Sequence, residues 1–365
     1  MKIAIITMPL RHNYGGILQN YALQRVLKEM GHDVTTLEIT KTEGLPLKAR
    51  IILIFRNLFY RCVDNNGRFL HILSSLTSEQ KLSQNTWPFI CNYINIKRIN
   101  GYPKEDEYDA YVVGSDQVWR PKYFDTDIAF LAFTKNYKKT RRLAYAVSFG
   151  TDCWEYSDAL SVKCSHLAAK FDAVSVREKM GIKLCKDHLH VDAIHVLDPT
   201  MLLSKNDYLQ GLGIKTSYSG KELFYYFLDE NENKRALVER ISNCKRWKSY
   251  TVNSRVEDSN VPLNERIQPP IEDWIQAFET SSFIVTDSFH GSVFSLLFNK
   301  PFIVIGNTER GLSRFTSLMG LFNQEYRVVT ENDLNDLELD TYMKQPNVDL
   351  NDKRLKSIAF IKKNL

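Results

Sequence analysis

Short apolar runs alternate with amphipathic stretches along most of this chain. Residues 3–7 are largely apolar, residues 17–30 carry apolar side chains at helical spacing, and residues 34–39 are largely apolar again. Gly31 follows the helical stretch, at the position where helices commonly end. This order predicts a strand, a helix and a second strand at the start of the chain, and therefore a parallel sheet.

The same alternation continues after one interruption. Residues 41–105 are basic, aromatic and mostly helical in pattern, so we interpret them as a helical insertion in the first domain. Further strands are expected at residues 109–114, 143–149, 173–176 and 193–197, with helices near 157–170 and 178–186. A segment rich in Gly, Ser and Lys near residues 211–220 then separates two α/β sets.

The second set predicts strands at 223–228, 249–252, 283–286 and 302–305, with helices near 232–243, 271–280 and from 289 onwards. A length of 365 residues also favours two domains. We therefore predict an α/β fold of two Rossmann-like domains in a GT-B-like arrangement, with an interdomain cleft. The expected domains are 1–215 and 216–350, and a final helix within 351–365 is expected to pack back on the first domain.

Composition and charge narrow the classes of function. The net charge is only +5, from 48 basic and 43 acidic residues, which gives no support for a nucleic-acid partner. Six scattered cysteines with no CxxC pair are typical of free thiols in a reducing compartment. No apolar run is long enough to span a bilayer. We expect a cytoplasmic protein, with contact to the inner face of the membrane left open by a basic, apolar stretch near residues 48–61, which we favour as a helix packed on the domain.

Clusters of polar residues follow the predicted strands, where ligands bind to open parallel sheets. The segment after the first strand holds Asn13, Gly15 and Gly16 before a helix, where two glycines let a ligand approach the backbone and the helix start favours an anion. A plain tight turn is the alternative. Ser288, His290 and Gly291 lie at a similar strand-to-helix junction and could hold a phosphate, unless Ser288 is an N-cap and His290 a structural histidine.

Charged residues supply further candidates. Arg177 directly follows a predicted strand and suits a carboxylate or phosphate, with a simple ion pair to Glu178 as the alternative. Asp116 could accept a proton from a sugar hydroxyl, or could cap a turn. Trp119 could stack on a sugar ring, and Gln117 lies between these two residues. Arg310 and Arg314 are four residues apart, so on a helix they share one face, which could line an anionic pocket or be solvated.

A metal site is not expected. Cys185, His188, His190 and His195 are crowded, but their spacing matches no zinc pattern that we can justify.

The ordered set of motifs resembles the polysaccharide pyruvyl transferase family. The matching segments span roughly residues 3 to 320: Asn13-Tyr-Gly-Gly, Gln19-Asn-Tyr-Ala-Leu23, Gly114-Ser-Asp-Gln-Val-Trp119, Ser175-Val-Arg-Glu178, Asp198-Pro-Thr200, Thr286-Asp-Ser-Phe-His-Gly291 and Asn299-Lys-Pro-Phe302. The resemblance implies an enzyme that transfers a pyruvyl group from phosphoenolpyruvate to a sugar of a cell-surface polysaccharide or its precursor, as a cyclic ketal. It implies no cofactor beyond the donor substrate and an acceptor that could be lipid-linked.

The resemblance also assigns site residues. Arg177 and the pair His290 and Gly291 match family positions, and many members have an Arg where this chain has Ser288. Arg310 or Arg314 could supply that missing charge. We assign His290, Asp116 and Arg177 to catalysis. Donor binding is assigned to Arg177, Ser288, His290, Gly291, Arg310, Arg314, Gly15 and Gly16, and acceptor binding to Asp116, Gln117, Trp119 and Asn13.

Two other functions remain open at this point. The first is a nucleotide-sugar-dependent glycosyltransferase of the same fold, since a fold does not determine a chemistry. The second is a non-catalytic member that binds glycan, which the departure at Ser288 keeps open.

Overall fold

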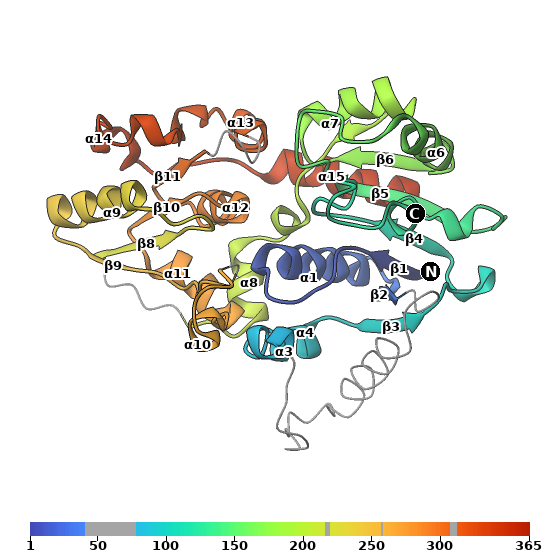
Figure 1. The fold of residues 1–365 in the computed structure, drawn as a ribbon, viewed down its shortest axis with the longest axis horizontal. Helices are drawn as coiled ribbons and strands as arrows, with labels where there is room; N and C mark the ends of the chain where they lie inside the picture. Colours follow the sequence, from blue (N-terminus) through green and yellow to red (C-terminus); the bar gives the residue numbers. More distant parts are fainter. Residues whose placement is uncertain (41–77, 216–219, 257, 307–311) are drawn as a thin grey trace, which may run out of the picture.

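The computed structural model describes residues 1–40, 78–215, 220–256, 258–306 and 312–365. Within these residues the chain forms two parallel sheets, each covered by helices on both faces (Figure 1). The predicted fold class, two Rossmann-like domains in a GT-B-like arrangement, is therefore confirmed.

The first sheet has seven described strands in the order β3-β2-β1-β4-β5-β6-β7, all in parallel. Its elements are β1 (Lys2–Ile6), α1 (Tyr14–Glu29), β2 (Asp33–Thr40), α3 (Ser78–Leu82), α4 (Trp87–Tyr93), β3 (Ile96–Asn100), β4 (Ala110–Val113), α5 (Thr126–Ala129), β5 (Arg141–Val147), α6 (Asp158–Ala168), β6 (Ala173–Val176), α7 (Lys179–Leu184), β7 (Ile194–His195) and α8 (Lys205–Gly211). Short helical turns lie at Glu105–Glu107, Ala132–Thr134, Cys185–Leu189 and Pro199–Leu202.

The second sheet has five described strands in the order β12-β11-β10-β8-β9, again all parallel. Its elements are β8 (Glu222–Tyr226), α9 (Glu232–Lys245), β9 (Lys248–Tyr250), α10 (Leu263–Arg266), α11 (Ile271–Thr280), β10 (Phe283–Thr286), α12 (Phe289–Leu297), β11 (Phe302–Ile305), α13 (Leu312–Gly320), β12 (Val328–Val329), α14 (Leu339–Tyr342) and α15 (Asn351–Asn364), with short turns at Glu325–Arg327 and Glu331–Asp333.

The predicted helical insertion is partly wrong. Residues 41–77 lie outside the described residues, so that part stays a prediction. Residues 96–100 form strand β3, which pairs with β2 and extends the first sheet. The sequence does not predict this strand because it lies at the edge of the sheet and contains charged residues. Lys97 pairs with Glu107 there, and Arg98 pairs with Glu38.

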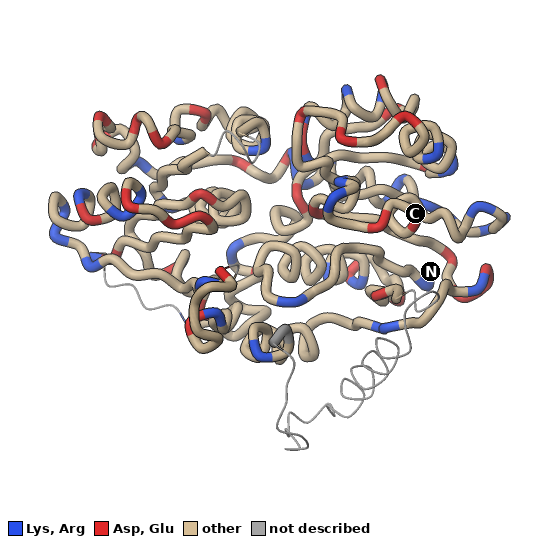
Figure 2. Tube along the Cα trace, in the orientation of Figure 1, with Lys and Arg blue, Asp and Glu red and all other residues tan. Residues whose placement is uncertain are grey.

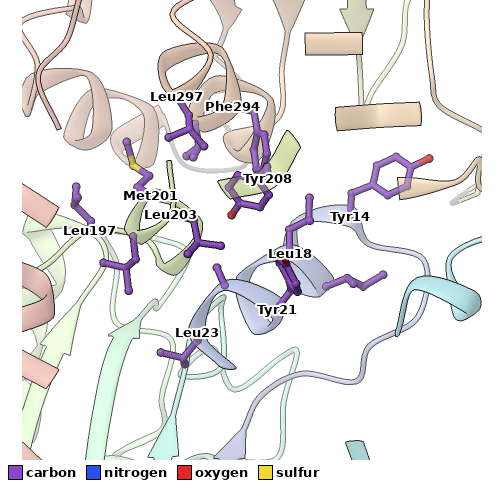
Figure 3. Packing of buried hydrophobic residues seen from close by; sticks show 14 of the residues in the cluster. Tyr14, Leu18, Tyr21, Leu23, Leu197, Met201, Leu203, Tyr208, Phe294 and Leu297 are labelled. Carbon is purple, nitrogen blue, oxygen red and sulfur yellow. The ribbon is translucent and has the colours of Figure 1, made fainter. Parts of the chain in front are cut away.

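One of the hydrophobic clusters contains residues of both domains. Side chains of α1 pack with Tyr208 of α8 and with Phe294 and Leu297 of α12, so first-domain and second-domain residues share one cluster (Figure 3). At the start of α1, the Tyr14 hydroxyl donates a hydrogen bond to the Pro269 carbonyl at 2.8 Å. Burial of this continuous apolar surface fixes the two sheets relative to each other.

The last helix, α15, contacts the first domain. The backbone N–H of Leu197 donates to Ser357 Oγ at 3.0 Å, and Arg354 Nε donates to the Met201 carbonyl at 3.0 Å. Basic and acidic positions are interspersed over both domains (Figure 2). Among the described residues, no helix combines the length and the apolar character needed to cross a bilayer.

Replacing the buried Arg327 should strongly destabilise the second domain. Its buried guanidinium donates to the carbonyls of Phe302, Tyr342 and Lys344. Arg327→Met would leave these acceptors without donors, so we expect the free energy of unfolding in urea to fall by about 2–4 kcal/mol. The control, Arg235→Met, removes only an exposed pair with Glu230 and should cost less than about 1 kcal/mol. Equal losses in the two variants would contradict this view.

Candidate functional site

Polar segments meet where the strand order of each sheet reverses. In the first sheet this point lies between β1 and β4, and in the second it lies between β8 and β10. Doubly wound sheets bind ligands beyond the carboxyl ends of the strands at such points. Gly15 and Gly16 follow β1, Asp116 follows β4, and His290 follows β10.

Asp198 is the residue that joins these segments. Its carboxylate accepts hydrogen bonds from Gln19 Nε2 at 2.5 Å and from the backbone and hydroxyl of Thr200 at 3.0 and 2.6 Å. Arg177 Nη1 lies 3.4 Å from Asp198 Oδ2, and His290 Nε2 lies 3.6 Å from the same oxygen. Asp198 is only 2% exposed, so these groups replace water around its charge.

Charges across this cluster stabilise one another. Burial alone would raise the pKa of Asp198, but His290, Arg177 and the Thr200 hydroxyl together hold that pKa well below its usual range. Burial likewise opposes the charged form of Arg177. The carboxylates of Glu178, Asp198 and Asp116 outweigh it, and the pKa of Arg177 is raised.

Arg177 is enclosed by its partners. Its Nε donates to Glu178 Oε1 at 2.8 Å, its Nη1 lies 3.9 Å from Asp116 Oδ1, and its guanidinium carbon lies 4.3 Å from the centre of the Phe289 ring. Only 2% of the side chain is exposed. Arg177 therefore lies among three carboxylates, and its Nε and Nη1 donate hydrogen bonds to two of them, Glu178 and Asp198.

His290 comes from the second domain. Ser288 is the N-cap of α12, and its hydroxyl accepts a hydrogen bond from the Gly291 backbone at 3.3 Å. The His290 side chain is 11% exposed, and its Nε2 has no hydrogen-bond partner among the described residues, although it faces Asp198 at 3.6 Å. The distance exceeds a normal hydrogen bond, so the present contact is electrostatic.

Gly15 lets the two domains approach at this point. A Cβ atom at Gly15 would lie 1.9 Å from His290 Nδ1, whereas a Cβ at Gly16 would meet Asp116 Oδ2 at an ordinary 3.6 Å. The first turn of α1 therefore faces both candidate proton-transfer groups. Asp116 itself has φ of 62°, a left-handed backbone that non-glycine residues adopt infrequently and that recurs at functional sites.

Arg314, on α13 of the second domain, belongs to the same cluster. Its pKa is lowered first by burial and then by the nearby charge of Arg177, while Glu178 and Asp116 act in the opposite sense. Nearby, the Lys179 backbone N–H donates to Ser317 Oγ at 2.9 Å and so joins α13 to the start of α7. Arg310 lies outside the described residues, so its role stays a prediction.

The predicted role of Trp119 is wrong. This side chain is fully buried, its indole N–H donates to the Ala129 carbonyl at 3.3 Å, and its ring stacks on Phe130 at 4.6 Å. A sugar ring cannot stack on a face that the core already covers. Gln117 accepts a hydrogen bond from Arg120 at 3.1 Å, and the Asn13 side chain caps α1, so their acceptor-binding roles stay predictions.

The sequence predicts no role for Asp198 or Gln19, and it offers Glu178 only as an ion-pair partner of Arg177, a contact that the structure shows at 2.8 Å. Asp198 follows a predicted strand, in the same kind of position as the candidates that were chosen. Gln19 is a polar residue on the buried side of α1, where it is 2% exposed. A polar residue within an otherwise apolar helical stretch was the available signal, because buried polar groups need partners.

The histidines that are crowded in the sequence have different partners in the structure. His188 stacks on Trp154 with ring centres 4.4 Å apart, while His195 Nε2 donates to the Arg177 carbonyl at 2.8 Å. Within the part of the chain that the structure describes, no group of three or more His, Cys, Asp and Glu residues is arranged to hold a metal ion.

Fold and site together define a two-domain, doubly wound α/β protein with a polar cluster between its domains. The family model for polysaccharide pyruvyl transferases matches residues 13–309, which is most of the chain. The chain therefore belongs to this family, and it is a transferase. No curated protein sequence matches the chain.

Solved structures with a similar course of the chain include two UDP-GlcNAc 2-epimerases. The enzyme of Neisseria meningitidis has 11% identity and a TM-score of 0.48, over 100% of this chain and 99% of that one. The enzyme of Methanocaldococcus jannaschii has 12% identity and a TM-score of 0.49, over 99% of this chain and 100% of that one. Likeness of this degree does not identify the substrate of this chain.

Two glycine substitutions test the contact between the domains. Alanine is more stable than glycine within a helix. Gly16→Ala should therefore leave the free energy of unfolding unchanged or raise it by up to about 1 kcal/mol. Gly15→Ala must displace the His290 ring, because the new Cβ would lie 1.9 Å from His290 Nδ1, and we expect a loss of about 1–3 kcal/mol. Urea unfolding of both variants measures the difference. A Gly15→Ala protein as stable as Gly16→Ala would show that His290 does not pack against α1.

Asp198→Asn should change how stability depends on pH. Because the pKa of folded Asp198 lies below its unfolded value of 3.8, its contribution is complete above about pH 5 and is lost as the pH falls through the folded pKa. The variant should therefore be less stable at pH 7, by about 3 kcal/mol, with a deficit that shrinks below pH 4.

Urea unfolding from pH 7 to pH 3 measures this dependence. Asp336→Asn, which changes an exposed carboxylate, should show no such deficit. A constant difference between wild type and Asp198→Asn down to pH 3 would contradict the ionic role of Asp198.

Proposed function

We propose that this protein transfers the pyruvyl group of phosphoenolpyruvate to two hydroxyls of one sugar in a surface polysaccharide or its precursor. One observation above all supports this function. Asp198 of the first domain faces Arg177 of the same domain and His290 of the second domain, in a family member whose reaction needs a proton donor, a proton acceptor and cations.

The chemistry sets the requirements for the site. The methylene carbon of phosphoenolpyruvate gains a proton, which leaves positive charge on the neighbouring carbon that bears the phosphate and the carboxylate. Two sugar hydroxyls form bonds to this carbon, the bond to the phosphate oxygen breaks, and inorganic phosphate leaves. Of the two hydroxyl protons, one balances the proton gained by the methylene carbon and the other leaves with phosphate. A general acid and a general base accelerate such steps by about 10²–10⁴-fold each.

His290 is our candidate for the proton donor. An imidazole can carry a proton at physiological pH, and its unpartnered Nε2 faces a buried carboxylate that would orient the protonated ring. Arg177 acts on His290 through Asp198, because its guanidinium is buried among carboxylates and holds Asp198 ionised. Arg177 is in this proposal a positioning residue.

Asp116 is our candidate for the base on the acceptor side. Its side chain is 13% exposed, more than that of Arg177 or Asp198, and it lies beside Gly16. The neighbouring positions that solvent reaches include Gln117, which is half-buried, and Asn13, which is exposed. An acceptor sugar approaching from this side would place its hydroxyl near the Asp116 carboxylate.

Arg314 is our candidate for the cation that binds the donor. Burial lowers the pKa of Arg314, and the like charge of Arg177, which comes from the other domain, lowers it further. A bound anion would relieve this repulsion, and phosphoenolpyruvate carries both a carboxylate and a phosphate. Arg314 then supplies the positive charge that many relatives are expected to place at the position of Ser288.

Kinetic variants should separate these roles. With purified protein, phosphoenolpyruvate and extracted polysaccharide precursors, we expect phosphate release together with an acceptor that mass spectrometry identifies as a ketal. Arg314→Gln should raise the KM for phosphoenolpyruvate by about 10–100-fold, as expected for loss of a charge-assisted hydrogen bond. His290→Gln should lower kcat by about 10²–10⁴-fold with a smaller change in KM.

Arg246→Gln provides the matched control, because this exposed arginine lies in the same domain, just after α9 and away from the cluster. It should leave both kinetic constants unchanged. Full turnover by His290→Gln would refute the proton-donor role. Turnover of a nucleotide sugar, without any ketal formed from phosphoenolpyruvate, would instead establish a glycosyltransferase.

A further inference from the structure

A separate cavity of about 280 Å³ opens at the carboxyl ends of β8 and β9. Tyr225 and Phe227 line it from β8 and the residue that follows, and Asn253 lines it from the segment after β9. None of its lining residues belongs to the cluster around Asp198. Ligands of parallel sheets bind at carboxyl ends of strands, so the position itself suits a binding site.

Aromatic side chains give the cavity an apolar wall. The rings of Tyr225 and Phe227 lie 5.5 Å apart with an angle of 39° between their planes. Phe227 is 3% exposed and anchors this wall in the core, while Tyr225 is half-buried and remains available to a ligand. An aromatic face with a polar rim is well suited to the C–H face of a sugar ring.

Charged groups of the cavity disfavour an anion. The cavity is lined by two carboxylates, Glu230 and Glu265, and by one arginine, Arg255. Glu230 is paired with Arg235 at 2.8 Å, and Arg255 is paired with Asp258 at 2.7 Å and lies 3.7 Å from Glu265, so these five groups together carry one net negative charge. A phosphate or a nucleotide diphosphate would meet net negative charge here. Neutral hydroxyl groups, by contrast, can donate hydrogen bonds to both carboxylates.

Hydrogen bonds to backbone carbonyls hold the polar side of the cavity in place. Asn253 Nδ2 donates to the Phe227 carbonyl at 2.6 Å, which ties the segment after β9 to the end of β8. The Arg255 backbone N–H donates to the Glu265 carbonyl at 3.1 Å. A preformed wall reduces the ordering cost that a ligand must overcome.

The cavity lies at the end of β8, and His290 lies in α12, just after the neighbouring strand β10. The Leu228 backbone N–H, directly after the Phe227 wall, donates to Asp287 Oδ1 at 2.6 Å, and Asp287 lies three residues before His290. Neighbouring strands are about 4.8 Å apart, so an oligosaccharide of a few units could extend from one strand end towards the other.

We propose that this cavity binds a neutral sugar unit of the acceptor, at a distance from the unit that receives the pyruvyl group. The link to the acceptor rests on the proposed function, whereas sugar binding in the cavity does not require turnover. Tyr225 would stack on the sugar ring, and Glu230 and Glu265 would accept hydrogen bonds from its hydroxyls. The protein would then recognise several sugar units of the acceptor rather than only the one that receives the pyruvyl group.

Saturation-transfer NMR tests binding without any reaction. The probes are neutral trisaccharides of glucose, galactose, mannose and N-acetylglucosamine, each added to the intact protein. At least one should receive saturation from wild type. Tyr225→Leu and Glu265→Gln should each weaken its Kd by about tenfold or more, because a stacking face or a hydroxyl acceptor is lost. The control, Tyr326→Leu, removes another exposed tyrosine of the same domain and should bind normally.

Three results would overturn this site: no transfer to any trisaccharide, normal binding by both cavity variants, or displacement of the sugar by UDP. Thermal unfolding of each variant checks that a loss of binding is not a loss of fold. The two proposals also fail differently. Sugar binding without ketal formation would refute pyruvyl transfer and leave the cavity assignment in place. Ketal formation with an unchanged acceptor KM in both cavity variants would refute the cavity assignment alone.

Discussion

A single buried carboxylate connects the parts of this structure that matter for chemistry. Asp198 is 2% exposed and can stay ionised only because charged and polar groups surround it. One of these groups, Arg177, is held in turn by Glu178, and another, His290, belongs to the other domain. Contact between the two domains therefore completes the cluster, because separating them would take His290 away from the buried Asp198 carboxylate.

The apolar core secures that contact. Figure 3 shows side chains from α1, α8 and α12 meeting in one cluster, and the Tyr14 hydroxyl adds a hydrogen bond across the junction. The residue after Tyr14 is Gly15, whose missing side chain makes room for His290. Packing and the proposed chemistry thus depend on adjacent residues of one helical turn. The proposed cavity for a remote sugar unit also lies at the carboxyl ends of the second sheet's strands, as His290 does.

The sequence predicted the alternation of strands and helices well, because buried parallel strands are short apolar runs and the helices between them are amphipathic. It failed for β3, an edge strand with charged side chains, and for the part of the insertion that contains it. For the site, proximity to strand ends correctly brought Arg177, His290, Asp116 and Gly15 together. Trp119 was misjudged because a motif does not reveal whether a ring faces solvent or core. Asp198 received no role because its partners come from both domains, and such contacts have no local sequence signal.

The most direct test of the central claim is thermal unfolding with added ligands. Phosphoenolpyruvate, inorganic phosphate and UDP would each be added to wild type and to Asp198→Asn. If the cluster around Asp198 forms a phosphoenolpyruvate site, this ligand alone should stabilise wild type strongly, by about 2.7 kcal/mol at a hundred times its Kd, and the variant much less. Stabilisation by UDP but not by phosphoenolpyruvate, or an equal effect of phosphoenolpyruvate on both proteins, would contradict the account.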